Sequence, residues 1–388
     1  KNILKIAYNM NFNISFNKYI KKTIFPGLSK HNFPNKEQYD YFIVIPVFNE
    51  FDYLLATLQS INDQDQSLLK KTLVVLVINN CIDSDKSIKN NNQLTFEMIQ
   101  NKKFNYEYII LDYYSMGNEL PINKSGVGVA RKIGMDYCLS YSYASSLLFC
   151  LDADTLIAKS YLTKIVNYYN KVNFGTCIVN FSHQKSTNPK IEKAIRVYEN
   201  ILYKIANKIK ACNSPYGYVS MGSTIVCNVK SYIAVGGMPQ KSAAEDFYFL
   251  QALAKYNSIN VLNEYLVYPS SRLEMRVYLG TGFRMIQYDK NENFLDLNFP
   301  DYCFDKVKKI IEFVDLNYKI SDSLFFKELN KNFDDKICNF LNDHNLKKIW
   351  NRINNNARSK KQFMIFFHQW FDALKIMQLL KILHNTKV

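Results

Sequence analysis

Apolar and polar positions alternate in blocks along the first half of the chain. Five short runs are rich in β-branched and aromatic residues and are bounded by proline, asparagine or aspartate, so we expect buried strands at 41–46, 73–78, 106–111, 147–151 and 176–180. Between them apolar residues recur at helical spacing, which predicts helices at 53–61, 128–137, 156–169 and 191–209. This alternation predicts an α/β fold with a mainly parallel, Rossmann-like sheet flanked by helices, whose ligands bind beyond the carboxyl ends of the strands.

The pattern changes at both ends of this region. Residues 1–40 are polar and rich in Asn and Lys, and we expect a lead-in segment with a short helix and a loop. Residues 41–300 form the expected α/β domain, and 301–388 carry amphipathic helical patterns without strand signals. One aromatic helix is expected at 362–383. It fits a core or oligomer-interface helix and also a basic helix in a membrane interface, and both interpretations stay open.

Composition narrows the class of partner. A hydrophobic fraction of 48% excludes a disordered chain, and a formal net charge of +15 favours anionic partners. The eight cysteines show no C-x-x-C spacing, which indicates reduced thiols in a cytosolic setting. We see no signal peptide and no spanning segment, so we expect a cytoplasmic protein, with peripheral binding to the inner face of an anionic membrane as a further possibility.

Two carboxylates, Asp152 and Asp154, follow the predicted strand 147–151 directly. On an extended chain they point to the same side, where both can meet one hard divalent cation. The alternative is that Asp154 or Thr155 caps the following helix. Two like charges side by side are unfavourable without a cation, which favours the metal site.

Other polar groups follow neighbouring strands. Pro46-Val-Phe-Asn-Glu50 ends the first strand, and Asn79-Asn80 ends the second; ordinary loops or Asx turns would explain both. The segment from Lys124 to Arg131 combines glycines, two cations and a helix start, which suits a diphosphate. Gly236-Gly237 suggests a turn pressed close to a ligand. Glu245-Asp246 begins a helix and offers a general base, although dipole effects alone favour acids there.

In this order the motifs Pro46-Val-Phe-Asn-Glu50, Asn79-Asn80, Gly128-Val-Ala-Arg131, Asp152-Ala-Asp154, Gly236-Gly-Met238 and Glu245-Asp246 resemble the family-2 glycosyltransferases with the GT-A fold, over roughly residues 41–268. The resemblance implies Mg²⁺ or Mn²⁺ held by Asp152 and Asp154 on the donor diphosphate. It implies Asp246 as the catalytic base, with Glu245 orienting the acceptor. The implied nucleotide-sugar-binding residues are Pro46, Phe48, Glu50, Asn79, Asn80, Lys124, Arg131, Asp152, Ala153, Asp154, Gly237 and Met238.

The chain departs from this family pattern at two places. Asn79-Asn80 stands where many relatives have Asp-Asp, which leaves the nucleotide open. The Gln-x-x-Arg-Trp segment of processive synthases is missing, and Ser270-Ser-Arg272 with Arg276 stands in its place; these arginines could meet a phosphate, or Arg276 could form a structural ion pair. His183 is expected to be structural, since lone histidines usually are.

The expected activity is metal-dependent, inverting transfer of a sugar from a nucleotide-diphospho-sugar to a hydroxyl of a glycan, lipid-linked or small-molecule acceptor, as in polysaccharide biosynthesis. A nucleotidyltransferase is one alternative, but it would carry a glycine-rich basic loop after the first strand. A non-catalytic protein that binds membrane or other anions is another alternative. We expect no nucleic-acid partner, since a nucleic-acid face seldom keeps acidic pairs clustered.

Overall fold

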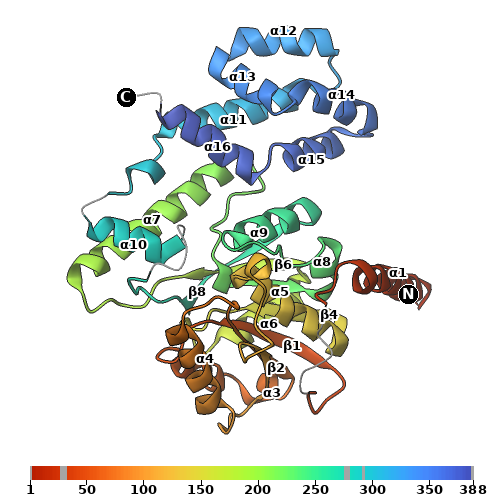
Figure 1. The fold of residues 1–388 in the computed structure, drawn as a ribbon. Coiled ribbons are helices and arrows are strands. Elements are labelled where there is room, and N and C mark those ends of the chain that lie inside the picture. Colours follow the sequence, from red (N-terminus) through yellow and green to blue (C-terminus); the bar gives the residue numbers. More distant parts are fainter. Residues whose placement is uncertain (1, 27–32, 275–279, 291–292, 386–388) are drawn as a thin grey trace. The chain divides into compact units, whose positions relative to one another are not determined.

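The structure is a computed structural model that describes residues 2–26, 33–274, 280–290 and 293–385. The chain divides into two compact units, one of Lys1–Ile195 with Ser220–Glu292 and the other of Arg196–Val219 with Asn293–Val388. The long helix α7 (Pro189–Ala211), predicted at 191–209, contributes to both units (Figure 1). Whether the units fold as independent domains, with a boundary near residue 300, stays a prediction.

The first unit is built on one eight-stranded sheet with strand order β3-β2-β1-β4-β7-β6-β8-β5. The strands are β1 (Tyr39–Val47), β2 (Thr72–Asn79), β3 (Glu107–Tyr113), β4 (Ser142–Cys150), β5 (Leu156–Ile157), β6 (Thr176–Phe181), β7 (Ile225–Asn228) and β8 (Ile259–Tyr268). All five predicted strands are present, and every residue of β2 is buried. The expectation of a buried strand at 106–111 is only partly right, because β3 lies at the edge of the sheet and alternates between buried and half-buried residues.

Strands β3, β2, β1 and β4 are parallel to one another, as predicted. The sheet as a whole is mixed, since β7 lies antiparallel between β4 and β6, and β5 is antiparallel to β8. The short strand β7 was not predicted. Its direction matters for the site, because the residues before an antiparallel strand lie at the edge where β4 ends.

The helices of the first unit are α1 (Asn2–Lys22), α2 (Leu54–Asn62), α3 (Gln66–Leu69), α4 (Lys86–Ile99), α5 (Val127–Cys138), α6 (Tyr161–Val172), α8 (Val229–Ala234), α9 (Glu245–Tyr256) and α10 (Gly280–Asp289). The prediction of one helix at 156–169 is wrong at its start. Leu156 and Ile157 pair with β8, so α6 begins only at Tyr161. Helix α5 packs on β1 and β2, where a side chain at Gly134 would meet Val44 at 2.4 Å.

The second unit is helical, as predicted. It contains α11 (Asp301–Leu316), α12 (Asp322–Asn332), α13 (Asp335–Asp343), α14 (Leu346–Asn356), α15 (Lys360–Trp370) and α16 (Ala373–His384). Trp350 stacks on Phe325 in its core, with ring centroids 3.4 Å apart. The prediction of one helix at 362–383 is wrong, because α15 ends at Trp370 and a new helix, α16, begins at Ala373. The Asp372 side chain caps α16 by accepting from the Lys375 amide at 3.2 Å.

The aromatic stretch at 362–383 packs inside the second unit, where Phe363, Phe367 and Leu380 are buried. This is the core position that the sequence left open. Within the described ranges, no helix combines the length and apolar character that crossing a bilayer requires. All eight cysteines are free thiols, as expected, and only Cys81 is not fully buried.

Candidate active site

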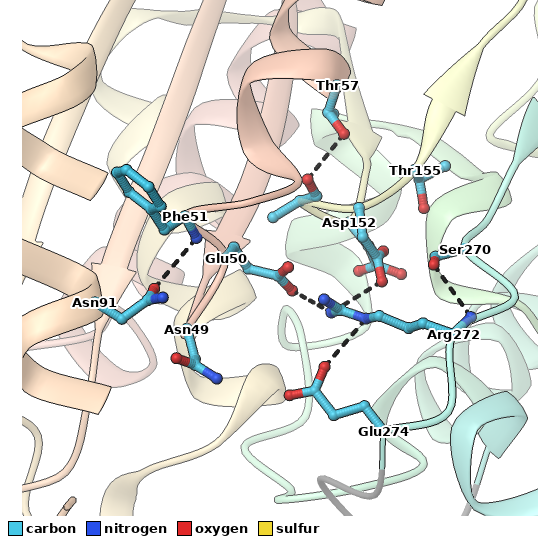
Figure 2. A network of polar contacts seen from close by, with 12 residues as sticks. Asn49, Glu50, Phe51, Thr57, Asn91, Asp152, Thr155, Ser270, Arg272 and Glu274 are labelled. Atoms are coloured by element: carbon cyan, nitrogen blue, oxygen red, sulfur yellow. Dashed lines mark hydrogen bonds and ion pairs between the residues drawn. The ribbon is translucent and has the colours of Figure 1, made fainter. Parts of the chain in front are cut away.

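The Asp152-Ala153-Asp154 segment leaves the buried end of β4 at the edge of the sheet. Leu151 donates its amide to the Val44 carbonyl at 3.1 Å, so the chain stays attached to β1 up to the first aspartate. Thr57 of α2 then donates its hydroxyl to the Ala153 carbonyl at 2.8 Å (Figure 2). The capping alternative for Asp154 and Thr155 is wrong, because the N-cap of α6 is Ser160.

Arg131 joins Asp152 to the acidic pair of α9. Its guanidinium forms ion pairs with both Asp152 and Glu245, and the residue is only 3% exposed. The second oxygen of Asp152 accepts a hydrogen bond from the Ser223 hydroxyl at 2.5 Å. A side chain at Gly222 would lie 2.3 Å from the guanidinium, so only glycine leaves room for Arg131 there. Three segments distant in sequence therefore meet at one buried cation.

Arg272 makes a second network, which Figure 2 shows. Its guanidinium lies 2.7 Å from a carboxylate oxygen of Glu50, 3.0 Å from Asp154 and 3.2 Å from Glu274. It also stacks 4.2 Å from the ring centroid of Tyr53. Arg272 thus connects the end of β1 with the end of β4.

One guanidinium cannot neutralise three carboxylates. Burial, and then the charge of Asp154, raise the pKa of Glu50 from 4.5 to about 9, although Arg272 opposes the shift. Arg272 itself stays charged, because burial lowers its pKa less than the acids raise it. The raised pKa of Glu50, which is 2% exposed, favours its protonated form, and burial also raises the pKa of Asp154, which Arg272 opposes.

The acidic pair at the start of α9 is also perturbed. Burial raises the pKa of Glu245 to about 7, and burial likewise raises the pKa of Asp246, with Arg131 opposing both shifts. The half-buried Asp246 carboxylate accepts from the Phe247 amide at 2.7 Å. Ala244, just before the pair, has a positive φ of 59°, an unfavourable conformation for a residue with a side chain.

A network of asparagine amides holds the ends of β1 and β2. Asn79 donates to the carbonyls of Val47 and Val77 at 3.0 and 3.1 Å. Asn92 donates to the Asn80 side chain at 2.9 Å and accepts from the Asn49 amide at 3.0 Å. The predicted ligand-binding amides of Asn79 and Asn80 are therefore used, at least in part, to support the loop that carries Glu50.

Part of the chain is similar to a known protein family. The family model described as Glycosyl transferase family 2 matches residues 42–225. The match covers less than half of the 388 residues, so this part of the chain is similar to glycosyltransferase family 2, a family of nucleotide-sugar transferases. A search of curated proteins gave no significant match.

Two solved structures are also similar to this chain. TarS 1–349 from S. aureus in complex with UDP-GlcNAc is 14% identical, and the alignment covers 88% of this chain and 89% of that chain with a TM-score of 0.41. The mannosyltransferase PcManGT from Pyrobaculum calidifontis in complex with GDP-Man and Mn²⁺ is 11% identical, with 95% and 98% covered and a TM-score of 0.41. The donors and the manganese are properties of those proteins, and we draw no conclusion from them here.

The charges of the candidate site suit a divalent cation. The two networks join five carboxylates to two guanidiniums, so negative charge is in surplus. Among the described residues, no group of three or more His, Cys, Asp or Glu side chains is arranged to hold a metal. A cation bound at Asp152 and Asp154 would therefore take its remaining oxygen ligands from the donor or from water, as Mg²⁺ usually does.

The remaining predicted site residues that the structure describes take no part in the ion pairs of the two arginine networks. Pro46 is buried inside β1, Phe48 is half-buried, and Lys124 is exposed in a short 3₁₀ turn (Ile122–Lys124). Gly237 and the buried Met238 lie in the loop before α9. Arg276 lies outside the described residues.

His183 has a structural environment, as expected. It is buried, packs edge-on against Phe181 and lies 3.1 Å from the Thr281 hydroxyl. Sequence reasoning missed Gly222, Ser223 and Tyr53. A Gly-Ser-Thr sequence before a β-branched run was the only signal for the first two, and it is common in ordinary turns.

Proposed function

We propose that the chain is an inverting, metal-dependent glycosyltransferase that moves a sugar from a nucleotide-diphospho-sugar to an acceptor hydroxyl. The observation that carries this proposal is the buried Arg131, which joins Asp152 after β4 to Glu245 at the start of α9. Asp152 on the proposed donor-diphosphate side and Glu245 on the proposed acceptor side therefore share one buried guanidinium.

Both arginines keep unused donors for an anion. Nε of Arg131 and Nη1 of Arg272 are buried and have no hydrogen-bond partner among the described residues. A buried donor without a partner is costly, and a diphosphate oxygen would satisfy it. We assign Arg131 and Arg272 to the charge that develops on the leaving nucleoside diphosphate.

Asp246 is the proposed base. Burial raises its pKa and so makes the ionised carboxylate a stronger proton acceptor, while the nearby Arg131 keeps that form accessible. Asp246 takes the proton of the acceptor hydroxyl as the hydroxyl oxygen attacks the anomeric carbon. The attack comes from the face opposite the leaving nucleoside diphosphate, whose bond to that carbon breaks. The new bond forms on the other face of the sugar, so the configuration inverts.

Asp152 and Asp154 are the proposed holders of Mg²⁺ or Mn²⁺. A divalent cation there would neutralise the donor diphosphate and lower the barrier to its departure. The acceptor is proposed only as a hydroxyl compound: a glycan, a lipid-linked sugar or a small molecule. Peripheral contact with an anionic membrane stays a prediction from the net charge, and liposome sedimentation tests it.

The decisive variant is Asp246→Asn. We expect transfer to fall by about 10²–10⁴-fold, the usual contribution of a positioned base, with donor binding by calorimetry unchanged. Asp85→Asn is a matched control, because Asp85 is an exposed carboxylate at the start of α4 whose side chain makes no cap hydrogen bond. Full activity of Asp246→Asn would reject the base assignment. Absence of nucleotide-sugar binding with Mn²⁺ present would reject the proposed function.

A further inference from the structure

A buried polar cluster lies where α1 meets α5 and α8, away from the two arginine networks. The Asp136 carboxylate accepts from the hydroxyls of Tyr19 and Tyr232 at 2.6 and 2.8 Å and from the Phe25 amide at 2.8 Å. Lys132, one turn earlier on α5, pairs with it at 2.9 Å. Both charged residues are at most 1% exposed. Such a fully satisfied buried pair gives a fixed geometry rather than much net stability.

Tyr19 is the member of this cluster that reaches the loop before α9. Gly237 has a positive φ of 79°, and a side chain there would lie 2.1 Å from the Tyr19 hydroxyl oxygen. Lys132 also donates to that hydroxyl at 2.8 Å. The hydroxyl therefore fills the space beneath the Gly236-Gly237 turn and holds it against α5.

The same face of α5 supports the rest of this loop. A side chain at Gly128 would lie 2.6 Å from the Pro239 carbonyl and 2.9 Å from the Glu245 Cβ atom. Gly128, Arg131 and Lys132 are spaced i, i+3 and i+4, so they share one side of the helix. Along this side, Lys132 holds the Tyr19 hydroxyl of α1 near the Gly236-Gly237 turn, and Gly128 lies against the Pro239 carbonyl of the loop. Arg131 forms an ion pair with Glu245 of the acidic pair.

We propose that Tyr19 is a positioning residue for the transfer step: helix α1 seats the Gly236-Gly237 turn on α5 and thereby sets Glu245 and Asp246 relative to Arg131. Helix α1 lies beside α8 in Figure 1 and precedes the region that matches the family model, which begins at residue 42. The inference rests on the proposed roles of Glu245 and Asp246.

The test compares Tyr19→Phe with Tyr232→Phe. Each variant removes one hydroxyl donor from the same oxygen of Asp136, and Tyr19→Phe also removes an acceptor of Lys132, so both should lower Tm and Tyr19→Phe should lower it more. Only Tyr19→Phe removes the contact beneath Gly237. We expect it to lower kcat about fivefold or more while the donor Kd from calorimetry stays within twofold, and we expect Tyr232→Phe to retain kcat. Hydrogen exchange of the amides at 236–246 should rise in Tyr19→Phe alone.

A second measurement uses Gly237→Ala, whose new methyl group collides with the Tyr19 hydroxyl. Adding Tyr19→Phe removes the colliding oxygen and leaves the ring carbon at 3.1 Å, so part of the lost kcat should return in the double variant. Equal exchange at 236–246 in the two tyrosine variants overturns the inference, even if transfer is not measurable. Equal kcat values with an inactive Asp246→Asn overturn it while leaving the proposed function intact.

Discussion

Glu50→Gln tests the charge balance around Arg272. Glu50 shares that guanidinium with Asp154 and Glu274, and burial together with Asp154 raises its pKa to about 9. The folded protein should therefore hold a proton on Glu50 at neutral pH. Glutamine has the shape of the protonated acid but does not titrate, so the variant removes the titration while keeping one hydrogen-bond acceptor for Arg272.

The size of the effect follows from proton linkage. In the unfolded chain Glu50 releases its proton above its ordinary pKa of 4.5, whereas in the folded chain it keeps it until about 9. The stabilisation from this raised pKa is fully present below 4.5 and is lost as pH rises towards 9. The loss is about 1.4 kcal/mol per pH unit, or about 3 kcal/mol between pH 5.5 and 7.5.

Urea unfolding without divalent metal measures this effect. The free energy of unfolding is compared for the native protein and Glu50→Gln at several values between pH 5.5 and 8.5. Other groups titrate equally in both, so the difference should grow in favour of the variant by about 1.4 kcal/mol per pH unit. A difference that stays constant with pH would mean that Glu50 is ionised in the folded protein and would refute the reasoning.

Glu119→Gln provides the control with the opposite sign. Burial opposes ionisation of Glu119, but the Gly117 amide and Lys89 lower its pKa below the ordinary 4.5. Its contribution to stability is present above that ordinary value and is lost only as pH falls through the lowered pKa. The difference between Glu119→Gln and the native protein should therefore be flat between pH 5.5 and 8.5.

Three further predictions concern the site. Gly222→Ala should displace the Arg131 guanidinium, which a Cβ atom would approach to 2.3 Å, and should lower the free energy of unfolding by about 3–5 kcal/mol, as breaking a buried ion pair does; a loss under about 1 kcal/mol would contradict this. Ala244→Gly should raise Tm through about 1 kcal/mol of relieved strain at a φ of 59°, and an unchanged or lower Tm would argue against strain. Arg272→Gln should bind Mn²⁺ about tenfold more tightly without donor in spin-resonance titrations, because Asp154 loses a competing cation; equal affinity would count against that competition.

The sequence predicted that Glu50 and Asp152 follow the ends of two neighbouring strands, but not how their charges pair. The ends of β1 and β4 were predictable because each strand ends in a buried apolar run with a clear boundary. Arg272 lies 222 residues from Glu50, and no local pattern specifies so long a contact. Ser223 reaches Asp152 because β7 runs antiparallel to β4, and a four-residue strand gives too little alternation to predict.

The N-terminal segment shows a second limit of sequence patterns. Its Asn- and Lys-rich composition predicted a short helix and a loop, whereas α1 spans 21 residues. Among its described side chains, at 12–22, Tyr19 is the only one that is fully buried, so this part of the helix shows no apolar stripe that would indicate a docking face. Tyr19 contacts Asp136 across 117 residues through a single polar group, and such a contact becomes visible only in three dimensions.

Helix α5 carries the arginine that joins the proposed donor side of the site to the proposed base side. Residues 128–138 are all buried, so every charged side chain on this helix needs a partner inside the protein. Arg131 finds its partners in the acids of the site, and Lys132 and Asp136 find theirs in each other and in Tyr19. Arg131 and Lys132 are adjacent on this helix, so a displacement of Lys132 also displaces Arg131. A substitution at Tyr19 should therefore change the geometry at Arg131 although Tyr19 is not assigned to donor binding.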